Sequence, residues 1–192
     1  MNIGVLAMQG AYEEHINKLK ELNVDTVKII SENDLANLDG IIIPGGESTT
    51  MGKLIYTLGI HNKLRNKIHS GIPVWGTCAG MILLADCIEG QEYTYLSTMN
   101  IEVKRNAYGR QLGSFNTKAD MKGAGKDIEM VFIRAPYIKK VGNNVEVLSI
   151  VNDNIVAARE DNMLVTSFHP EITDDDRVHK YFIDMVKEYM KK

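Results

Sequence analysis

The chain has 192 residues, with 22 Lys and Arg against 25 Asp and Glu, so its formal net charge is −3. At roughly 100–200 residues per domain, this length predicts one domain over residues 1–192, with a core that needs no disulfide or structural metal. The small negative charge argues against nucleic acid as the main partner, and no apolar run approaches the roughly 18 residues of a membrane span. Two cysteines form no disulfide framework and no positively charged leader precedes the first predicted strand, so we expect a cytoplasmic protein.

The first half of the chain alternates short apolar runs with amphipathic segments. The expected strands are Ile3–Met8, Thr26–Ile30, Gly40–Ile43 and Ile72–Trp75. The expected helices are Tyr12–Leu22, Thr50–Leu58, His61–Ser70 and Met81–Asp86. Because these strands lack polar alternation and are separated by helices, they predict a parallel sheet covered on both faces.

The second half is richer in strand-like segments separated by turn residues. The expected strands are Tyr95–Val103, Arg110–Phe115, Met130–Arg134, Val145–Val151, Ile155–Arg159 and Met163–Phe168. Residues 152–162 are typical of hairpin sequence, and Lys118–Asp127 is expected to be an exposed loop. An amphipathic helix is expected at Asp174–Lys191.

Three glycine-rich loops follow predicted strands of the parallel sheet. They are Gln9-Gly10, Pro44–Thr49 and Gly76–Gly80. In an open parallel sheet, ligands bind in the crevice at the carboxyl ends of the strands. These three loops are therefore where we look for chemistry.

The most specific of these loops is Gly76-Thr77-Cys78-Ala79-Gly80, a G-x-C-x-G turn between a buried strand and a helix. It is the thiol counterpart of the G-x-S-x-G nucleophile elbow. The helix N-terminus favours thiolate, and the Ala79 N–H points to where an oxyanion would form. The alternative is a buried Cys that acts as a small hydrophobe. We prefer that alternative for Cys87, which has no glycine frame, and a nucleophile for Cys78.

A thiol nucleophile needs a base, and the base needs an acceptor that orients it. His169 follows an apolar strand and precedes Pro170-Glu171, so the Glu171 carboxylate can turn back toward the imidazole. We therefore predict a Cys78–His169–Glu171 triad, against the alternative of a strand-end histidine that is capped by chance. The other four histidines are interpreted as surface or partly packed residues: His15, His61, His69 and His179.

The loop Pro44-Gly45-Gly46-Glu47-Ser48-Thr49 can present backbone N–H groups to the crevice, and Gly46 is a candidate for the second oxyanion donor. An ordinary glycine-rich turn with Ser48 or Thr49 as helix N-cap is the alternative. A phosphate-binding loop is discounted because no Lys follows the glycines in the G-x-x-x-x-G-K-[ST] register.

Together, G-T-C-A-G-M, S-F-H-P-E and P-G-G-E-S-T resemble the class I, triad-type glutamine amidotransferases. L-A-M-Q-G, I-P-G-G-E-S-T-T, W-G-T-C-A-G-M-I-L-L-A, R-N-A-Y-G-R-Q-L-G-S-F and F-I-R-A-P narrow the resemblance to the glutaminase subunits of pyridoxal 5′-phosphate synthases. The five motifs span nearly the whole chain in the family's order. Met8 stands where the family often has Leu. The fold class expected is α/β, a flavodoxin-like three-layer sandwich with a mostly parallel central sheet and an added antiparallel hairpin region.

The resemblance implies a glutaminase that hydrolyses L-glutamine to L-glutamate and ammonia, with no cofactor and no metal. The ammonia would pass to a (β/α)8-barrel synthase subunit that builds pyridoxal 5′-phosphate. Cys78, His169 and Glu171 would be the catalytic triad. The glutamine site would be lined by Gly46, Glu47, Ser48, Arg105, Ile133 and Arg134.

The chemistry of glutamine fits these residue types. Arg105 or Arg134 suits the α-carboxylate, and Glu47 or a backbone carbonyl suits the α-ammonium. We also expect the Gly45-Gly46 peptide to be misoriented in the free subunit and to flip when the synthase binds, with Gln9-Gly10 in the contact surface. The alternatives are a glutaminase subunit of another amidotransferase, a stand-alone cysteine hydrolase or chaperone of the same fold, and a catalytically silent binding module.

Overall fold

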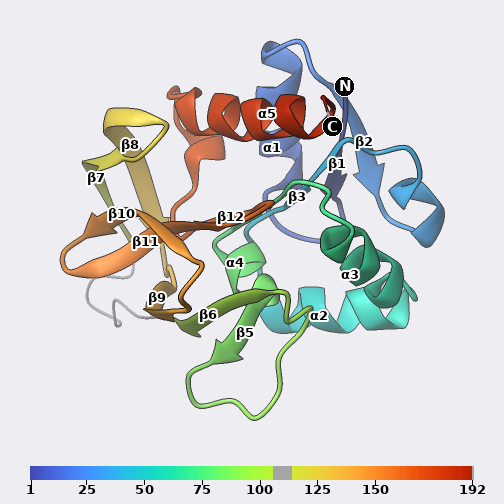
Figure 1. The fold of residues 1–192 in the computed structure, drawn as a ribbon, viewed down its shortest axis with the longest axis horizontal. Coiled ribbons are helices and arrows are strands. Elements are labelled where there is room, and N and C mark those ends of the chain that lie inside the picture. The colour runs from blue at the N-terminus through green and yellow to red at the C-terminus, as the bar shows by residue number, and fades with distance from the viewer. Residues whose placement is uncertain (106–113, 192) are drawn as a thin grey trace.

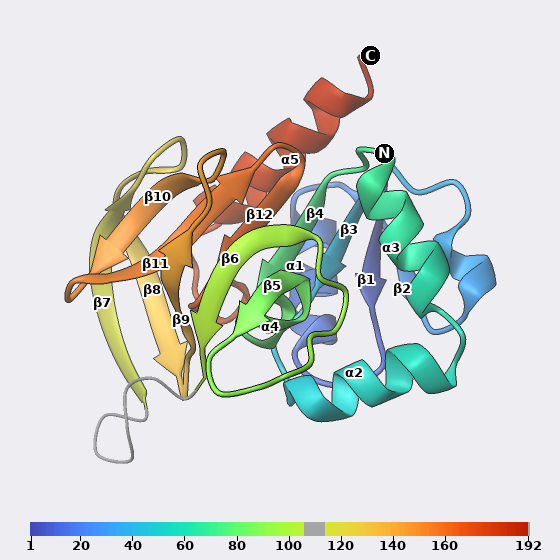
Figure 2. The same ribbon diagram turned by 60° about the horizontal axis from the view of Figure 1, so that its bottom comes forward.

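The structure is a computed structural model, and it describes residues 1–105 and 114–191. A long twisted sheet runs through the molecule, with helices on both faces (Figures 1 and 2). Its parallel half consists of β1 (Asn2–Leu6), β2 (Asp25–Ile29), β3 (Gly40–Ile43), β4 (Val74–Thr77) and β12 (Met163–Thr166). These strands lie in the order β2-β1-β3-β4-β12, and every neighbouring pair among them is parallel.

Beyond β12 the sheet continues as a mixed region, in the order β11-β9-β6-β5, with β10 paired to β11. Its strands are β5 (Ala85–Ile88), β6 (Met99–Lys104), β9 (Tyr137–Val141), β10 (Glu146–Val151) and β11 (Asn154–Glu160). The β10-β11-β12 meander is antiparallel and confirms the hairpin expected at residues 152–162. The predicted α/β class, with a parallel sheet and an added antiparallel region, is confirmed.

Helices form the two outer layers. They are α1 (Tyr12–Glu21), α2 (Ser48–Thr57), α3 (His61–His69), α4 (Ala79–Leu84) and α5 (Arg177–Tyr189), with 3-10 turns η1 (Glu32–Leu35) and η2 (Pro170–Ile172). Successive residues of β3 show the layering, because Ile41 and Ile43 pack with α2, α3 and α4 while Ile42 packs with α1 and α5. In Figure 1, α1 and α5 accordingly lie on one side of the sheet and α2 and α3 on the other.

The prediction of an exposed loop at Lys118–Asp127 is wrong. This stretch belongs to a separate antiparallel hairpin of β7 (Ser114–Met121) and β8 (Gly125–Ile133), with its turn between the two strands. Alternate residues of β7 face inward, and two of them, Thr117 and Ala119, are only weakly apolar. The period-two pattern of a half-buried strand is therefore faint in the sequence.

Several boundaries also differ from those expected. The helix predicted to reach Asp86 ends at Leu84, where the chain enters β5, and Tyr137–Val141 is a strand that the sequence did not predict. Cys87 lies on β5 with its side chain exposed, so its interpretation as a buried hydrophobe is wrong. Of the strand predicted at Arg110–Phe115, only 114 and 115 lie in the described residues, at the start of β7.

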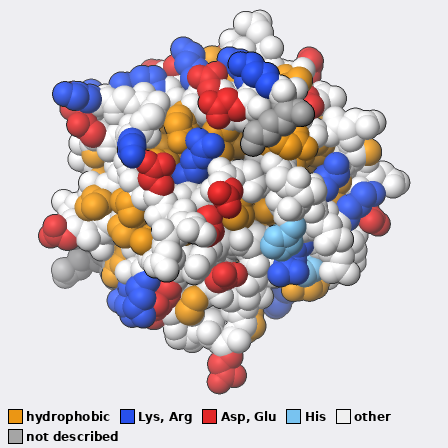
Figure 3. All heavy atoms as spheres, viewed as in Figure 1, with side chains coloured by type: hydrophobic (Ala, Val, Ile, Leu, Met, Phe, Trp, Pro, Cys, Tyr) orange, Lys and Arg blue, Asp and Glu red, His pale blue; other side chains and the backbone are white. Residues whose placement is uncertain are grey.

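The surface mixes charges of both signs, in keeping with the small net charge. On the face drawn in Figure 3, acidic and basic side chains are interspersed between small apolar areas. Within residues 1–105 and 114–191, none of the helices combines the length and the apolar character needed to cross a bilayer.

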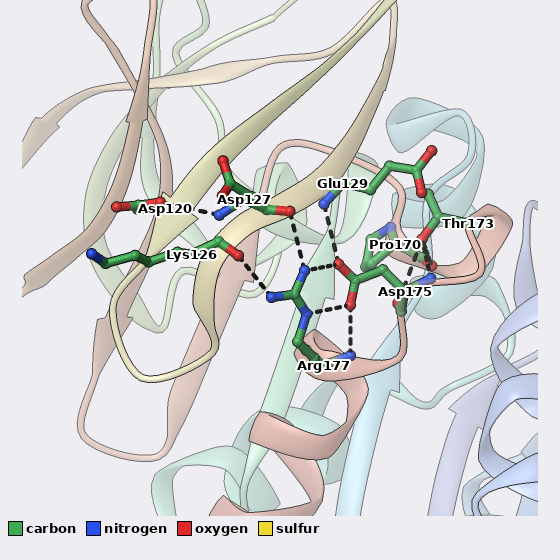
Figure 4. A network of polar contacts seen from close by, with 8 residues as sticks. All are labelled: Asp120, Lys126, Asp127, Glu129, Pro170, Thr173, Asp175 and Arg177. Atoms are coloured by element: carbon green, nitrogen blue, oxygen red, sulfur yellow. Dashed lines mark hydrogen bonds and ion pairs between the residues drawn. The ribbon is translucent and has the colours of Figure 1, made fainter.

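A polar clamp, formed by Asp175 and Arg177, ties the β7–β8 hairpin to the start of α5 (Figure 4). The Arg177 guanidinium donates to both carboxylate oxygens of Asp175, at 2.9 and 2.6 Å, and to the carbonyls of Lys126 and Asp127, at 2.7 and 3.1 Å. The Asp175 carboxylate also accepts from the Glu129 N–H of β8 at 3.2 Å. The hairpin is thereby fixed to the segment that follows β12.

Candidate active site

Cys78 lies in the turn between β4 and α4. Its backbone is left-handed, with φ 48° and ψ −102°, a conformation that is strained for a residue with a side chain. The Cys78 N–H donates to Thr166 O of β12 at 2.8 Å, which holds the turn against the neighbouring strand. Gly80 lets α4 approach β3, because a Cβ at this position would overlap the Ile43 carbonyl. The sequence-predicted elbow is therefore present, with the thiol at the carboxyl end of the parallel sheet.

His169 and Glu171 follow β12, directly beside that turn. His169 Nδ1 is 2.6 Å from Glu171 Oε1, and both residues are buried, with 8% and 4% of their surfaces exposed. The His169 N–H donates to Val131 O of β8 at 2.8 Å, so the hairpin fixes the backbone of the histidine. With Nδ1 engaged by the carboxylate, Nε2 is the nitrogen left for the thiol.

The protonation of His169 reflects its neighbours. Burial alone would lower its pKa, but hydrogen bonds with the Cys78 thiol and the Glu171 carboxylate, together with their charges, raise the pKa to about 10. The imidazolium form is therefore stabilised by the two groups that a triad places around it. This is the arrangement in which a thiolate–imidazolium pair forms.

A cavity of about 410 Å³ lies beside Cys78 and His169, at the same sheet edge. Cys78 and His169 line it directly, and its wall contains the candidate residues Gly46, Glu47, Ser48, Ala79, Arg105, Ile133 and Arg134, together with Gln9, Ile82 and Pro136. The volume suits an amino acid, which needs charged groups at one end and a reactive centre at the other. Among the described residues, no cluster of three or more His, Cys, Asp or Glu side chains is arranged to hold a metal ion.

Glu47 is the N-cap of α2, in place of the Ser48 or Thr49 cap considered from the sequence. Its carboxylate accepts from the Thr49 N–H at 3.1 Å and from the Thr50 N–H and hydroxyl, both at 2.7 Å. Burial opposes ionisation, but the hydrogen bonds from Thr50 and Thr49 outweigh it and lower the pKa of Glu47 to about 2. The cavity therefore has a fixed negative charge on this wall.

The two candidate arginines occupy different settings. Arg105 Nη2 is 3.5 Å from Glu47 Oε1 and 3.4 Å from Thr49 Oγ1, so its guanidinium is held at the cavity wall. Arg134 follows β8 with φ 43° and is exposed at the cavity rim, next to Ile133, which is 41% exposed. The motif that begins at Arg105 continues through residues 106–113, which lie outside the described part of the chain.

The glycine loop after β3 lies against the triad. A Cβ on Gly45 would overlap His169 Cε1, so only glycine allows the loop to approach the imidazole this closely. The Gly45 carbonyl accepts from the Ala11 N–H at 3.0 Å. Because this peptide is trans, the Gly46 N–H points the opposite way, away from the β1–α1 loop.

Sequence reasoning gave three polar residues no place in or behind the site, although it had named the Gln9-Gly10 loop. Gln9 lines the cavity, and its Oε1 accepts from the Glu47 N–H at 2.8 Å. His15 and His179 are fully buried, so their interpretation as surface or partly packed histidines is wrong. Helical spacing carried the missing signal, because each lies on the apolar face of its helix: His15 four residues before Leu19, and His179 three residues before Phe182. His61 is half-buried and His69 exposed, as that interpretation expected.

Curated proteins are similar to this chain over nearly its whole length. The chain is 56% identical over 186 residues to the pyridoxal 5′-phosphate synthase subunit PdxT of Clostridium botulinum (strain Loch Maree / Type A3), with 96% of each chain covered. A protein of the same name from Streptococcus pneumoniae serotype 2 (strain D39 / NCTC 7466) is 56% identical over 192 residues, covering 98% of this chain and 99% of the relative.

Solved structures give the same result. One described as "Crystal structure of glutamine amidotransferase" matches with a TM-score of 0.92 and 41% identity, covering 96% of this chain and 98% of that one. "Structure of PurLQS from Thermotoga maritima" matches with a TM-score of 0.71 at 14% identity, which supports the fold alone. A family model, the SNO glutamine amidotransferase family, matches residues 5–188, and the resemblance predicted from the motifs is confirmed. The chain belongs to the SNO glutamine amidotransferase family.

Proposed function

We propose that residues 1–192 act as a single glutaminase domain that hydrolyses L-glutamine to L-glutamate and ammonia through a thioester on Cys78. The observation that carries the proposal is that Cys78 and His169 line one amino-acid-sized cavity, with Glu171 hydrogen-bonded to His169 behind it. Family membership supports the same reaction class.

In the first half of the reaction, the Cys78 thiolate attacks the side-chain amide carbon of glutamine. The carbonyl oxygen becomes an oxyanion, which accepts hydrogen bonds from the N–H groups of Gly46 and Ala79. His169 then gives its proton to the amide nitrogen, the carbon–nitrogen bond breaks, and ammonia leaves. A γ-glutamyl thioester remains on the sulfur.

In the second half, His169 is neutral and accepts a proton from water as the water attacks the thioester carbon. The tetrahedral intermediate collapses and releases glutamate. This step restores the Cys78 thiolate and the His169 imidazolium with which the reaction began. Glu171 keeps Nδ1 of His169 protonated in both halves, so Nε2 exchanges the proton. No external oxidant or cofactor is required for this balance.

We propose that the cavity orients glutamine through its charged groups. Arg105 or Arg134 pairs with the α-carboxylate, and the Glu47 carboxylate, ionised above about pH 2, faces the α-ammonium. Gly46, Ser48 and Ile133 line the remaining wall. The side-chain amide then reaches the thiol.

We further propose that the ammonia passes to a synthase subunit with a (β/α)8 barrel, in a cytoplasmic hetero-oligomer that makes pyridoxal 5′-phosphate. The relatives from Clostridium botulinum and Streptococcus pneumoniae carry the name of a subunit of that synthase, which supports this assignment. A glutaminase subunit of another amidotransferase is the second candidate, and the identity of the activating partner separates the two.

Activation by the partner stays a prediction. The hydrogen bond from the Ala11 N–H to Gly45 O connects the oxyanion peptide to the β1–α1 loop, which also contains Gln9 and Gly10. A synthase that contacts this loop would act on the Gly45-Gly46 peptide through one hydrogen bond. We expect this peptide to be misoriented in the free subunit and to flip when the synthase binds, so the free subunit should be slow. Equal turnover by the free subunit and the complex would contradict the flip.

The test is glutamate release from glutamine, measured with and without the barrel synthase, for the natural chain and for Cys78→Ala. We expect release by the natural chain in the complex and a loss of several orders of magnitude in the variant. Cys87→Ala is the matched control, because this thiol is exposed on β5 away from the cavity. A natural chain without glutamate release in any combination would refute the glutaminase assignment and favour a binding module.

A further inference from the structure

A chain of buried polar side chains lies behind the triad, on the side of Glu171 that faces away from His169. Glu171 Oε2 is fully buried and has no hydrogen-bond partner within ideal geometry among the described residues. The donor group beside it is His15 Nε2, at 3.5 Å. His15 Nε2 is also 3.2 Å from Thr77 Oγ1, on the strand that leads to Cys78.

The chain continues to the last helix. His15 Nδ1 is 3.0 Å from His179 Nε2, so α1 and α5 meet through a pair of imidazoles. Both histidines are completely buried. The indole of Trp75 packs edge-on against both rings, with centroid distances of 5.3 and 4.9 Å. The rings therefore have little freedom to reorient.

Both imidazoles are neutral. Burial is the main cause and holds the pKa of His15 well below its usual value, with further lowering by His179 and His169. Burial, aided by the positive charge of Lys18, lowers the pKa of His179 to about 3 against the opposing charge of Asp176. A neutral imidazole has one donor and one acceptor nitrogen, so each link of the chain has a direction.

The carboxylate sets that direction. An ionised Glu171 only accepts, so a hydrogen bond between it and His15 needs the hydrogen on Nε2, from which Thr77 Oγ1 at 3.2 Å can accept as well. His15 Nδ1 is then an acceptor, and His179 must donate to it from Nε2. This leaves His179 Nδ1 as a bare acceptor, and that atom is indeed buried without a partner among the described residues. Leaving an acceptor unpaired costs less than leaving the second carboxylate oxygen unpaired next to the reacting groups.

We propose that His15 is a positioning residue for the triad carboxylate. Its Nε2–H holds Glu171 Oε2, so that Oε1 stays directed at His169 Nδ1, and His179 fixes the tautomer of His15. A shift of about 0.5 Å brings the 3.5 Å separation into the usual range of an N–H···O hydrogen bond. Because His15 is neutral, it orients the carboxylate without cancelling the negative charge that stabilises the imidazolium of His169.

This inference rests on the role proposed above for Glu171, and the variants are chosen by which nitrogen of His15 they replace. The amide nitrogen of Gln can occupy roughly the position of Nε2, whereas the amide oxygen of Asn can occupy roughly the position of Nδ1 and accept from His179. His15→Gln therefore keeps a donor near Glu171, and His15→Asn keeps only the polar group near His179. His15→Leu removes both. His69→Gln is the control, since His69 is exposed on α3.

The first readout is kcat and KM for glutamine in the complex with the synthase. We expect His15→Leu and His15→Asn to lower kcat by roughly 10- to 100-fold, the scale of a small misplacement of a reacting group, with KM within about twofold. His15→Gln recovers most of the loss, and His69→Gln changes neither constant. Equal activity of the Gln and Asn variants would overturn the proposal, because it would show that the Glu171 side of the ring is unimportant.

The second readout does not need glutaminase activity. The rate of Cys78 alkylation by iodoacetamide, followed against pH, reports the thiolate–imidazolium pair, and the downfield proton resonance of His169 Nδ1–H reports its hydrogen bond to Glu171. We expect the Leu and Asn variants to shift both signals and the Gln variant to restore them. Folded variants with the natural alkylation profile and resonance refute the positioning role, even if the natural chain proves not to be a glutaminase.

Discussion

At the scale of single residues, the reactive thiol depends on a backbone conformation that its neighbours enforce. A left-handed φ costs a non-glycine residue about 1–2 kcal/mol. At Cys78 this cost is offset by the hydrogen bond from its N–H to Thr166 O and by the close contact between α4 and β3. The side chain, although buried, thereby lines the cavity together with the imidazole of His169.

The assignment of the glutamine carboxylate to an arginine is testable at this scale. If Arg105 holds the carboxylate, Arg105→Gln should raise KM for glutamine roughly 10- to 100-fold with a smaller change in kcat, since a hydrogen bond to a charged group contributes about 1.5–3 kcal/mol. Steady-state kinetics of the complex measure both constants. Arg65→Gln is the control, because Arg65 donates to Leu96 O and does not line the cavity. An unchanged KM in Arg105→Gln, with a raised KM in Arg134→Gln, assigns the carboxylate to Arg134 instead.

The residues that sequence reasoning identified are those whose partners lie close in the chain. Cys78 and its glycine frame occupy five consecutive positions, and Glu171 is two residues from His169. His15 was misinterpreted because its partners lie on β4, η2 and α5, and no local sequence pattern predicts contacts with these distant elements. Its place on the apolar face of α1 indicated burial, but not what it would contact.

At the scale of elements, the parallel strands could be predicted from their local sequence, whereas the β7–β8 hairpin could not. Strands such as β3 (G-I-I-I) are buried on both faces, so each is an unbroken apolar run that sequence analysis recognises. The hairpin covers the core with one face only, and its inward positions include Thr117 and Ala119. Its β character depends on cross-strand pairing and on the clamp to α5, which the sequence of either strand does not contain.

The junction between β4 and α4 yields a prediction in which two effects have opposite signs. Helix propensity favours Gly80→Ala by about 1 kcal/mol, whereas the new Cβ overlaps a backbone carbonyl of β3. We expect the overlap to prevail, with a net loss of about 1–3 kcal/mol or more in the free energy of unfolding. Urea denaturation measures this difference.

Gly52→Ala is the matched control for that experiment. Gly52 is also helical, in α2, but its new Cβ meets the ring of Tyr95, a buried side chain, and not the backbone of a strand. We expect a clearly smaller loss than for Gly80→Ala. Equal losses would mean that the close approach of α4 to β3 is unimportant for stability.

The clamp at the hairpin gives a second prediction at this scale. Arg177→Gln removes the charged bridge between Asp175 and the carbonyls of Lys126 and Asp127. The pKa of Asp175, which the hydrogen bonds from Arg177 help to lower to about 2, should rise toward its ordinary value. We expect faster amide hydrogen exchange in β8, above all near Glu129, with little change in β1 or β3.

Lys180→Gln is the control for the clamp, because among residues 1–105 and 114–191 the ion-pair partner of Lys180 is Asp176, one helical turn away at 2.8 Å on the surface. Exposed pairs of this kind contribute little, so exchange in β8 should be unchanged. Exchange in β8 that is as slow in Arg177→Gln as in the natural chain would show that pairing with β7 alone holds the strand.

At the scale of the whole molecule, buried titratable groups predict how stability depends on pH. His15 and His179 have lowered pKa values in the folded state, so between their folded values and about 6.5 the unfolded chain binds more protons. The free energy of unfolding should therefore fall as the pH falls below about 6.5. The carboxylates of Glu47 and Asp175, with pKa values of about 2, add a further decline below about pH 4.5.

The raised pKa of His169 affects the free energy of unfolding at neutral and alkaline pH. Between about 6.5 and 10 the folded state binds the extra proton, so this stabilisation is complete below pH 6.5 and is lost as the pH rises toward 10. Chemical denaturation at intervals from pH 4 to pH 10 measures both limbs. His69→Gln should leave the curve unchanged, because this histidine is exposed. A flat curve between pH 6.5 and 4.5 would show that the two buried imidazoles do not remain neutral.

The pairing of β4 with β12 has a consequence for how this architecture can be varied. The two strands are adjacent and parallel. Cys78 follows the carboxyl end of β4, and His169 follows the carboxyl end of β12. The chain from 85 to 162 departs from this pair and returns to it. Homologues can therefore differ in the length or sequence of this segment without a change in the distance between the sulfur and the imidazole. The condition is that β8 still accepts the hydrogen bond from the His169 N–H.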